Sequence, residues 1–110
     1  METTVYINNK PVPLKASAST LRRYRALFNR DLLQDFTEIR ETFSSGNITG
    51  AAVEYAQNFI YVLAKQADKS IPDVDTWLDS FDIFPIGDLI APAVELWAAS
   101  MATTSEEKKT

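Results

Sequence analysis

The stretch GAAVEYAQNFIYVLAKQA, residues 50–67, is the most apolar segment of the chain and decides the expected fold. On a helical wheel its apolar side chains cover more than half of the circumference, which indicates contact with several neighbouring elements. We therefore predict a central helix over 50–67, with Thr49 as its N-cap. The remaining polar strip is narrow and consists of Glu54, Gln57, Asn58, Tyr61 and Lys65.

Two amphipathic helices and a β-hairpin are predicted before this helix. The hairpin covers about 4–15, because β-forming residues flank Asn8 and Asn9, a pair suited to a tight turn. A helix over 20–29 follows, capped by Ser17 or Ser19, and Asp31 caps a second helix over 32–43. Asn29 suits a left-handed C-cap between them. The expected inner stripes are Leu21, Tyr24, Leu27 and Phe28 in the first helix, and Leu32, Phe36, Ile39 and Phe43 in the second.

Two more helices are predicted after the central one. A short helix starts near Pro72, with Ser70 as its cap. The last helix has Pro85 in its first turn, and Pro92 is expected to kink it or delay its regular start. The expected inner faces are Val74, Trp77, Leu78 and Phe81 in the short helix, and Leu89, Ala93, Leu96 and Trp97 in the last.

Length and composition indicate a single globular domain. The chain has 110 residues, of which 45% are hydrophobic and 24% charged. We predict a mostly α fold, in which the N-terminal hairpin and about five helices pack as a compact bundle over 1–102. Residues 103–110 have no apolar anchor and are expected to form a flexible, disordered tail. No apolar stretch is long enough for a bilayer, and the N-terminus lacks a secretory-signal pattern, so no membrane partner is expected.

The charge is unevenly distributed along the chain. Residues 1–30 hold six basic residues and one acid, whereas residues 31–110 hold five basic residues and 14 acids. On the wheel, Arg22, Arg23 and Arg25 lie opposite the apolar stripe. The favoured interpretation is a solvated face or local ion pairs, ahead of a partner surface and well ahead of nucleic acid. The net charge of −4 disfavours nucleic-acid binding, which needs a dense cationic surface.

We find no pattern of residues that indicates catalysis or cofactor binding. The chain contains no cysteine and no histidine, which excludes thiolate chemistry and the commonest general base. Asp73, Asp75, Asp79 and Asp82 lack the glycine and glutamate of a calcium loop and are interpreted as an outer helix face. Asp35 and Glu38 are likewise interpreted as exposed acids. We expect no catalytic, cofactor-binding or metal-binding residue, and no enzymatic activity.

The segment INNKPVPLKASASTLRRYRALFNRDLLQDF, residues 7–36, resembles the start of phage tail assembly chaperones from phages and prophages of Gram-positive bacteria. That family has I-N-G/N-K, a short strand ending in leucine, a helix with L-R-x-Y/F-R, and an F-G-x-D-L turn. Asn29 stands where glycine is common. Later segments are also similar, so the resemblance covers about residues 5–100. The matching residues are Ile7, Asn8, Asn9, Lys10, Leu14, Leu21, Arg22, Tyr24, Arg25, Phe28, Asp31 and Leu32.

The resemblance implies a non-catalytic chaperone that binds the tape measure protein and keeps it soluble during tail assembly. Such a protein works in the host cytoplasm and is absent from the mature virion. The major tail protein is a further candidate partner, and self-association is left open. The alternatives are a structural tail or head–tail connector subunit retained in the virion, and a small adaptor or regulatory protein.

Large side chains on short elements are the candidates for partner contact: Tyr6, Trp77, Phe84 and Trp97. For the two tryptophans, a place in the core is the favoured interpretation over a ligand cage.

Overall fold

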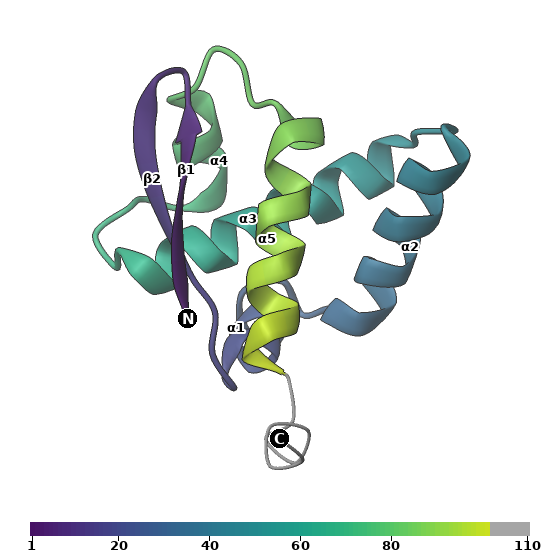
Figure 1. Cartoon of the computed structure of the whole chain (residues 1–110), viewed down its shortest axis with the longest axis horizontal. Helices are drawn as coiled ribbons and strands as arrows, with labels where there is room; N and C mark the ends of the chain where they lie inside the picture. The colour runs from purple at the N-terminus through teal and green to yellow at the C-terminus, as the bar shows by residue number, and fades with distance from the viewer. Residues whose placement is uncertain (102–110) are drawn as a thin grey trace, which may run out of the picture.

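In the computed structural model, which describes residues 1–101, a two-stranded hairpin is followed by five helices (Figure 1). The prediction of a mostly α fold with an N-terminal hairpin is confirmed, whereas the predicted tail at 103–110 lies outside the described residues. None of the helices in this part of the chain could span a lipid bilayer. The elements are β1 (Glu2–Ile7), β2 (Lys10–Lys15), α1 (Thr20–Phe28), α2 (Leu32–Ser45), α3 (Gly50–Ala67), α4 (Val74–Asp79) and α5 (Ile86–Ser100).

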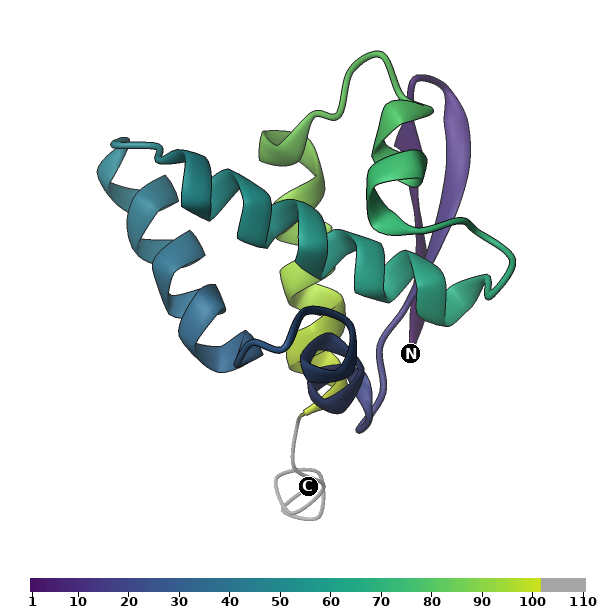
Figure 2. The same cartoon turned by 180° about the vertical axis from the view of Figure 1, so that it is seen from behind.

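Helix α3 is the centre of the molecule, as predicted. It crosses behind α5 in Figure 1 and in front of α5 in Figure 2, and β2, α1, α2 and α5 all pack on it. Phe59, Ile60 and Leu63 are completely buried there. The prediction that Tyr61 belongs to a polar strip is wrong. Its ring is buried, because its hydroxyl can donate a hydrogen bond of 2.6 Å to the carbonyl of Pro72.

The hairpin forms as the sequence predicts. Asn8 and Asn9 have φ of 53° and 65°, the left-handed values that a tight two-residue turn requires. Pro11 lies opposite Tyr6 and Pro13 opposite Thr4. Since hydrogen-bonded and non-hydrogen-bonded pairs alternate in an antiparallel ladder, both prolines occupy positions where no donor is needed for the pairing.

Three predicted helix caps, Asn29, Asp31 and Thr49, are confirmed, and the predicted cap Ser70 is wrong. Asn29 adopts the left-handed C-cap conformation, and the side chains of Asp31 and Thr49 accept hydrogen bonds from the backbone of α2 and α3. Asp73, and not Ser70, caps α4, since its carboxylate accepts from the amide of Thr76 at 3.2 Å. Ser70 instead bonds to Asp68, within the loop that precedes α4.

The start of α1 is held by a long-range contact. Ser19 occupies the N-cap position but makes no side-chain capping bond. Thr20, which is completely buried, donates to Gln66 at 2.9 Å, and Gln66 in turn donates to the Ser17 hydroxyl at 2.6 Å. These bonds tie α1 to the end of α3, a partner 46 residues away that local sequence cannot indicate.

Two further expectations about helices need correction. Leu27 was expected on the inner stripe of α1 but is 50% exposed, whereas the buried residues of α1 are Thr20 and Tyr24. Of the two effects expected of Pro92, a kink or a delayed start, the delay does not occur, because α5 begins at Ile86 and continues through Pro92. Pro85 precedes it as the N-cap residue. All four residues of the predicted inner stripe of α5 are buried, as expected.

Candidate functional site

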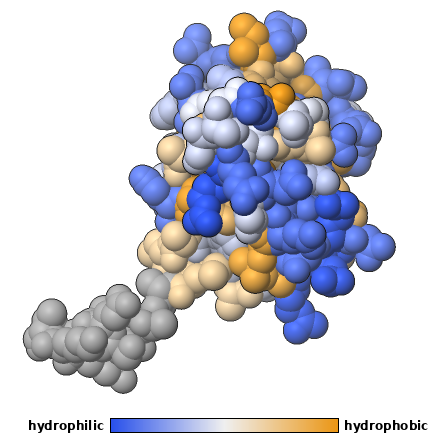
Figure 3. All heavy atoms as spheres, turned by 90° about the vertical axis from the view of Figure 1, so that its right-hand side faces the viewer, coloured by the Kyte–Doolittle hydropathy of each residue, from blue (hydrophilic) through white to orange (hydrophobic). Residues whose placement is uncertain are grey.

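An apolar groove lies between α2 and α5, with a volume of about 380 Å³. It exists because both helices pack on α3 but only sparsely on each other. On the face of the molecule that carries α2, hydrophobic atoms form small patches bounded by hydrophilic side chains (Figure 3). The groove is lined by Phe36, Ile39, Arg40, Phe43, Ser44, Ile90, Ala91, Val94 and Glu95.

The floor of this groove is supported by an aromatic cluster. The Phe36 ring meets the Trp97 ring edge-on, with 5.2 Å between their centroids, and Trp97 lies 5.6 Å from Phe59. Because Phe59 is completely buried and Trp97 is only 4% exposed, these two rings fix Phe36 from below. Trp97 thus shapes the groove but does not line it.

The two long walls of the groove carry opposite charges. Arg40 belongs to α2 and its guanidinium lies 5.9 Å from the centre of the Phe36 ring. Glu95 belongs to α5, and both side chains are exposed. Within residues 1–101 neither forms an ion pair. A ligand can therefore meet a cation on one side of the apolar floor and an anion on the other.

The orientation of α2 is fixed by a polar network at its first turn. Asp35 is only 1% exposed, so the prediction that it lies on a solvated face is wrong. Its carboxylate accepts from the Tyr24 hydroxyl at 2.7 Å and from two nitrogens of Arg30 at 2.8 Å. Arg30 also donates to the Tyr55 hydroxyl at 2.9 Å and lies 4.5 Å from the centre of that ring.

The two donors of this network hold their protons firmly. Burial raises the pKa of the Tyr24 hydroxyl, and its hydrogen bond to Asp35 raises it further. The hydrogen bond to Asp35 likewise raises the pKa of Arg30. Both donors therefore keep their protons at neutral pH, and within the described residues no buried side-chain polar atom is left without a partner. The arrangement joins α1, α2 and α3.

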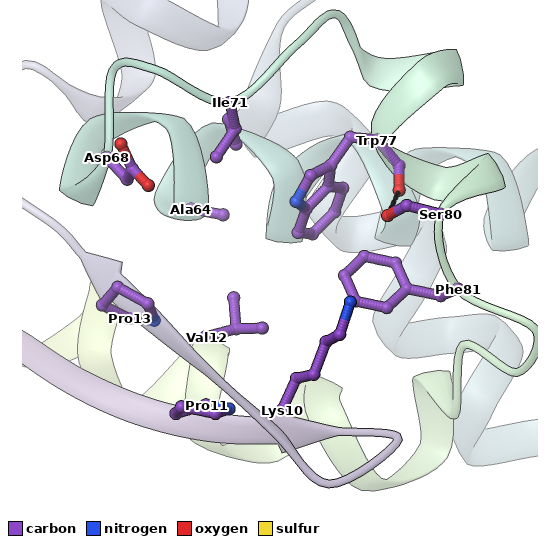
Figure 4. A pocket seen from close by; sticks show the side chains of 10 residues that line it. All are labelled: Lys10, Pro11, Val12, Pro13, Ala64, Asp68, Ile71, Trp77, Ser80 and Phe81. Atoms are coloured by element: carbon purple, nitrogen blue, oxygen red, sulfur yellow. Dashed lines mark hydrogen bonds between the residues drawn. The ribbon is translucent and has the colours of Figure 1, made fainter.

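A second cavity of about 370 Å³ lies between the hairpin and the α3–α4 region. Figure 4 shows Lys10, Val12 and Pro13 on the hairpin side, facing Ile71, Trp77 and Phe81. Its walls mix apolar rings with the single charges of Lys10 and Asp68. In residues 1–101, no three acidic side chains come close enough to hold a metal ion.

The four side chains proposed for partner contact do not form one surface. Tyr6 is 67% exposed on the hairpin, whereas Trp77 is 5% exposed and lines the second cavity. Phe84 is half-buried against Trp77, with ring centroids 5.6 Å apart, and Trp97 lies beneath the groove. The interpretation of both tryptophans as core residues is confirmed.

Sequence reasoning missed the groove-lining residues Phe43, Ile90 and Val94. Phe43 was assigned to an inner stripe, and the other two fell outside the stripe assigned to α5. Their half-buried state depends on the splay between two helices that are about 50 residues apart in the chain, which no local pattern encodes. One feature of the sequence could have indicated the groove: α5 carries more large apolar residues than a single inner stripe needs.

No protein-family model, curated protein or solved structure matches the chain.

Proposed function

We propose that this protein is a non-catalytic binding protein whose α2–α5 groove receives the apolar face of a helix from a client. The observation that carries the proposal is the groove itself: an apolar trough between two helices, set on a rigid aromatic floor. A helix laid in such a groove buries side chains spaced by three and four residues. The resemblance in the sequence identifies the proposed client as a phage tape measure protein.

The charges at the groove specify the client helix further. Its apolar stripe should be flanked by acidic side chains on the edge facing Arg40 and by basic side chains on the edge facing Glu95. A long helical client offers many such segments, so several copies of the chaperone bind along one client. Each contact can be weak and still keep the client soluble, because the copies act together along the chain.

Co-expression with the tape measure protein tests the proposal. The soluble fraction of the client should rise when the chaperone is present, and a complex should survive gel filtration. Phe43→Ser is the informative variant, since Phe43 lines the groove but lies outside the core cluster. Val53→Ser is the matched control, since Val53 is also a half-buried apolar residue on a helix but does not line the groove. Equal client solubility with and without the chaperone would contradict the proposal.

Mass spectrometry of purified virions separates this function from its alternatives. A tape measure chaperone acts in the host cytoplasm and should be missing from the particle. Detection at a fixed stoichiometry would instead identify a structural tail or head–tail connector subunit. Absence from the virion together with no effect on client solubility would favour an adaptor or regulatory role.

A further inference from the structure

The loop between α4 and α5 presents an exposed isoleucine on a rigid base. Ile83 is 66% exposed, whereas its neighbours Phe81 and Phe84 are half-buried. The rings of Phe81 and Phe84 lie 5.1 Å and 5.6 Å from Trp77, and 5.9 Å from each other. With both flanking rings packed on a buried tryptophan, the loop holds Ile83 outward in a defined position.

Acidic side chains surround this isoleucine in the sequence. Asp79 ends α4, Asp82 immediately precedes Ile83, and Asp88 lies in the first turn of α5. All three are exposed, and none pairs with a cation within the part of the chain that the structure describes. We call Asp79, Asp82, Ile83 and Asp88 the acidic knob. A partner for the knob must offer an apolar recess with cationic edges.

Helix α1 and the end of α3 form an apolar recess whose available cation is Arg23, since the Lys65 ammonium donates to the carbonyls of Lys69 and Ile71. A cavity of about 230 Å³ is lined by Arg23, Ala26, Leu27, Val62, Lys65 and Gln66, which we call the basic recess. Leu27 is 50% exposed at its edge, and Arg23 precedes Leu27 by one helical turn. The guanidinium of Arg23 bonds only to the Ser19 hydroxyl at 2.9 Å, so its charge is unpaired among the described residues.

We infer that the acidic knob of one copy docks into the basic recess of a second copy of this chain. The two surfaces are complementary in charge, and the exposed aliphatic side chain of the knob matches the apolar lining of the recess. They also lie at opposite ends of the molecule, with the α4–α5 loop at the top of Figure 1 and α1 at the bottom. The knob of one copy therefore cannot reach the recess of the same copy. This inference does not depend on the proposed client.

The contact has a distinctive physical signature. Because knob and recess are different surfaces, two copies leave one of each unoccupied, and oligomers should grow with concentration. The interface is small, so the association is weak. Exposed charges at its edges make it weaken as salt screens them. A client-binding role for the α2–α5 groove predicts none of these features.

Sedimentation velocity of the full chain tests the inference at concentrations up to about 1 mM, where a small interface associates. The mean sedimentation coefficient should rise with concentration in about 0.05 M salt, and rise much less in about 0.5 M salt. Ile83→Ser should weaken the association about tenfold or more, since an apolar side chain no longer becomes buried. Ile48→Ser is the matched control, since Ile48 is a loop isoleucine that is 53% exposed elsewhere.

A charge exchange identifies the pairing directly. Arg23→Glu and Asp82→Arg should each abolish the association alone, whereas an equal mixture of the two variants, or the double variant, should restore it. Arg25→Glu is the control for a charge reversal on α1 outside the recess, and thermal melting confirms that each variant is folded. If Arg23→Glu fails to fold, Leu27→Ser tests the recess by loss of association alone, and its equal mixture with Asp82→Arg should restore association.

Three outcomes would overturn the inference. The first is a monomer at every concentration in low salt. The second is equal loss of association in Ile83→Ser and Ile48→Ser. The third is failure of the mixed charge variants to associate.

Discussion

Asp35 is expected from the sequence to be exposed, but it is buried in the fold. In the sequence it lies among other acids on an amphipathic helix and is expected to be solvated. In the structure it accepts hydrogen bonds from Tyr24 and Arg30, and the second of these residues also reaches Tyr55. The burial of a carboxylate is tolerated here because its oxygens are matched by donors.

We predict that Asp35→Ala lowers the free energy of unfolding by about 2 kcal/mol, because the buried Tyr24 hydroxyl loses its partner. Loss of the Arg30 ion pair adds little to this change in the free energy of unfolding, because the Arg30 side chain is 44% exposed and can be hydrated instead. Urea denaturation measures the change. Glu38→Ala, at an exposed acid one turn further along α2, should stay within about 0.5 kcal/mol of the parent. Equal effects of the two substitutions would contradict the assigned network.

At the scale of elements, α3 organises the fold. It is buried along most of its length, and the hairpin and three helices pack around it. Phe59 lies at the middle of α3 and touches the aromatic cluster beneath the groove. Packing at this position therefore supports both the core and the shape of the candidate binding surface.

Phe59→Ala should cost about 3–5 kcal/mol, the usual range when a large aromatic side chain is removed from a core. Phe43→Ala is the comparison, since Phe43 is half-buried outside the core cluster and should cost clearly less. Thermal and urea unfolding measure both. An unchanged melting temperature in Phe59→Ala would show that α3 is not the organising helix.

The elements were largely predictable and their mutual placement was not. Asn29, Asp31 and Thr49 were identified correctly, because capping depends on residues within one turn. The burial of Asp35 and Tyr61 was missed because their partners lie on other segments. The α2–α5 groove was missed for the same reason, since it arises from the angle at which two helices meet a third.

At the scale of the whole molecule, the distribution of charge matters more than its total. The arginine-rich helix α1 lies at one end, and the acids of the α4–α5 region lie at the other (Figure 1). Such a molecule has a positive end although its net charge is −4. A protein partner, or another copy, can carry charges of both signs that match the two ends of the molecule. A nucleic acid is uniformly negative and is repelled by the acidic end.

We therefore predict that Arg22, Arg23 and Arg25 do not bind DNA. Titration with duplex and single-stranded DNA in about 0.15 M salt should show no binding tighter than about 100 µM, the weak end of non-specific affinities. The acidic remainder of the surface repels the phosphates that three arginines attract. Micromolar binding that weakens steeply with salt, and is lost when the three arginines are replaced by alanine, would contradict this prediction.

The prolines of β2 also affect how this protein behaves when it is abundant. A hairpin at the surface leaves strand edges to which further strands can add, which is the first step of amyloid-like stacking. Along the outer edge of β2, Pro11 and Pro13 offer no amide hydrogen, so an incoming strand would lack donors at both positions. An incoming strand therefore cannot complete a hydrogen-bonded ladder along that edge, which disfavours cross-β aggregation from it.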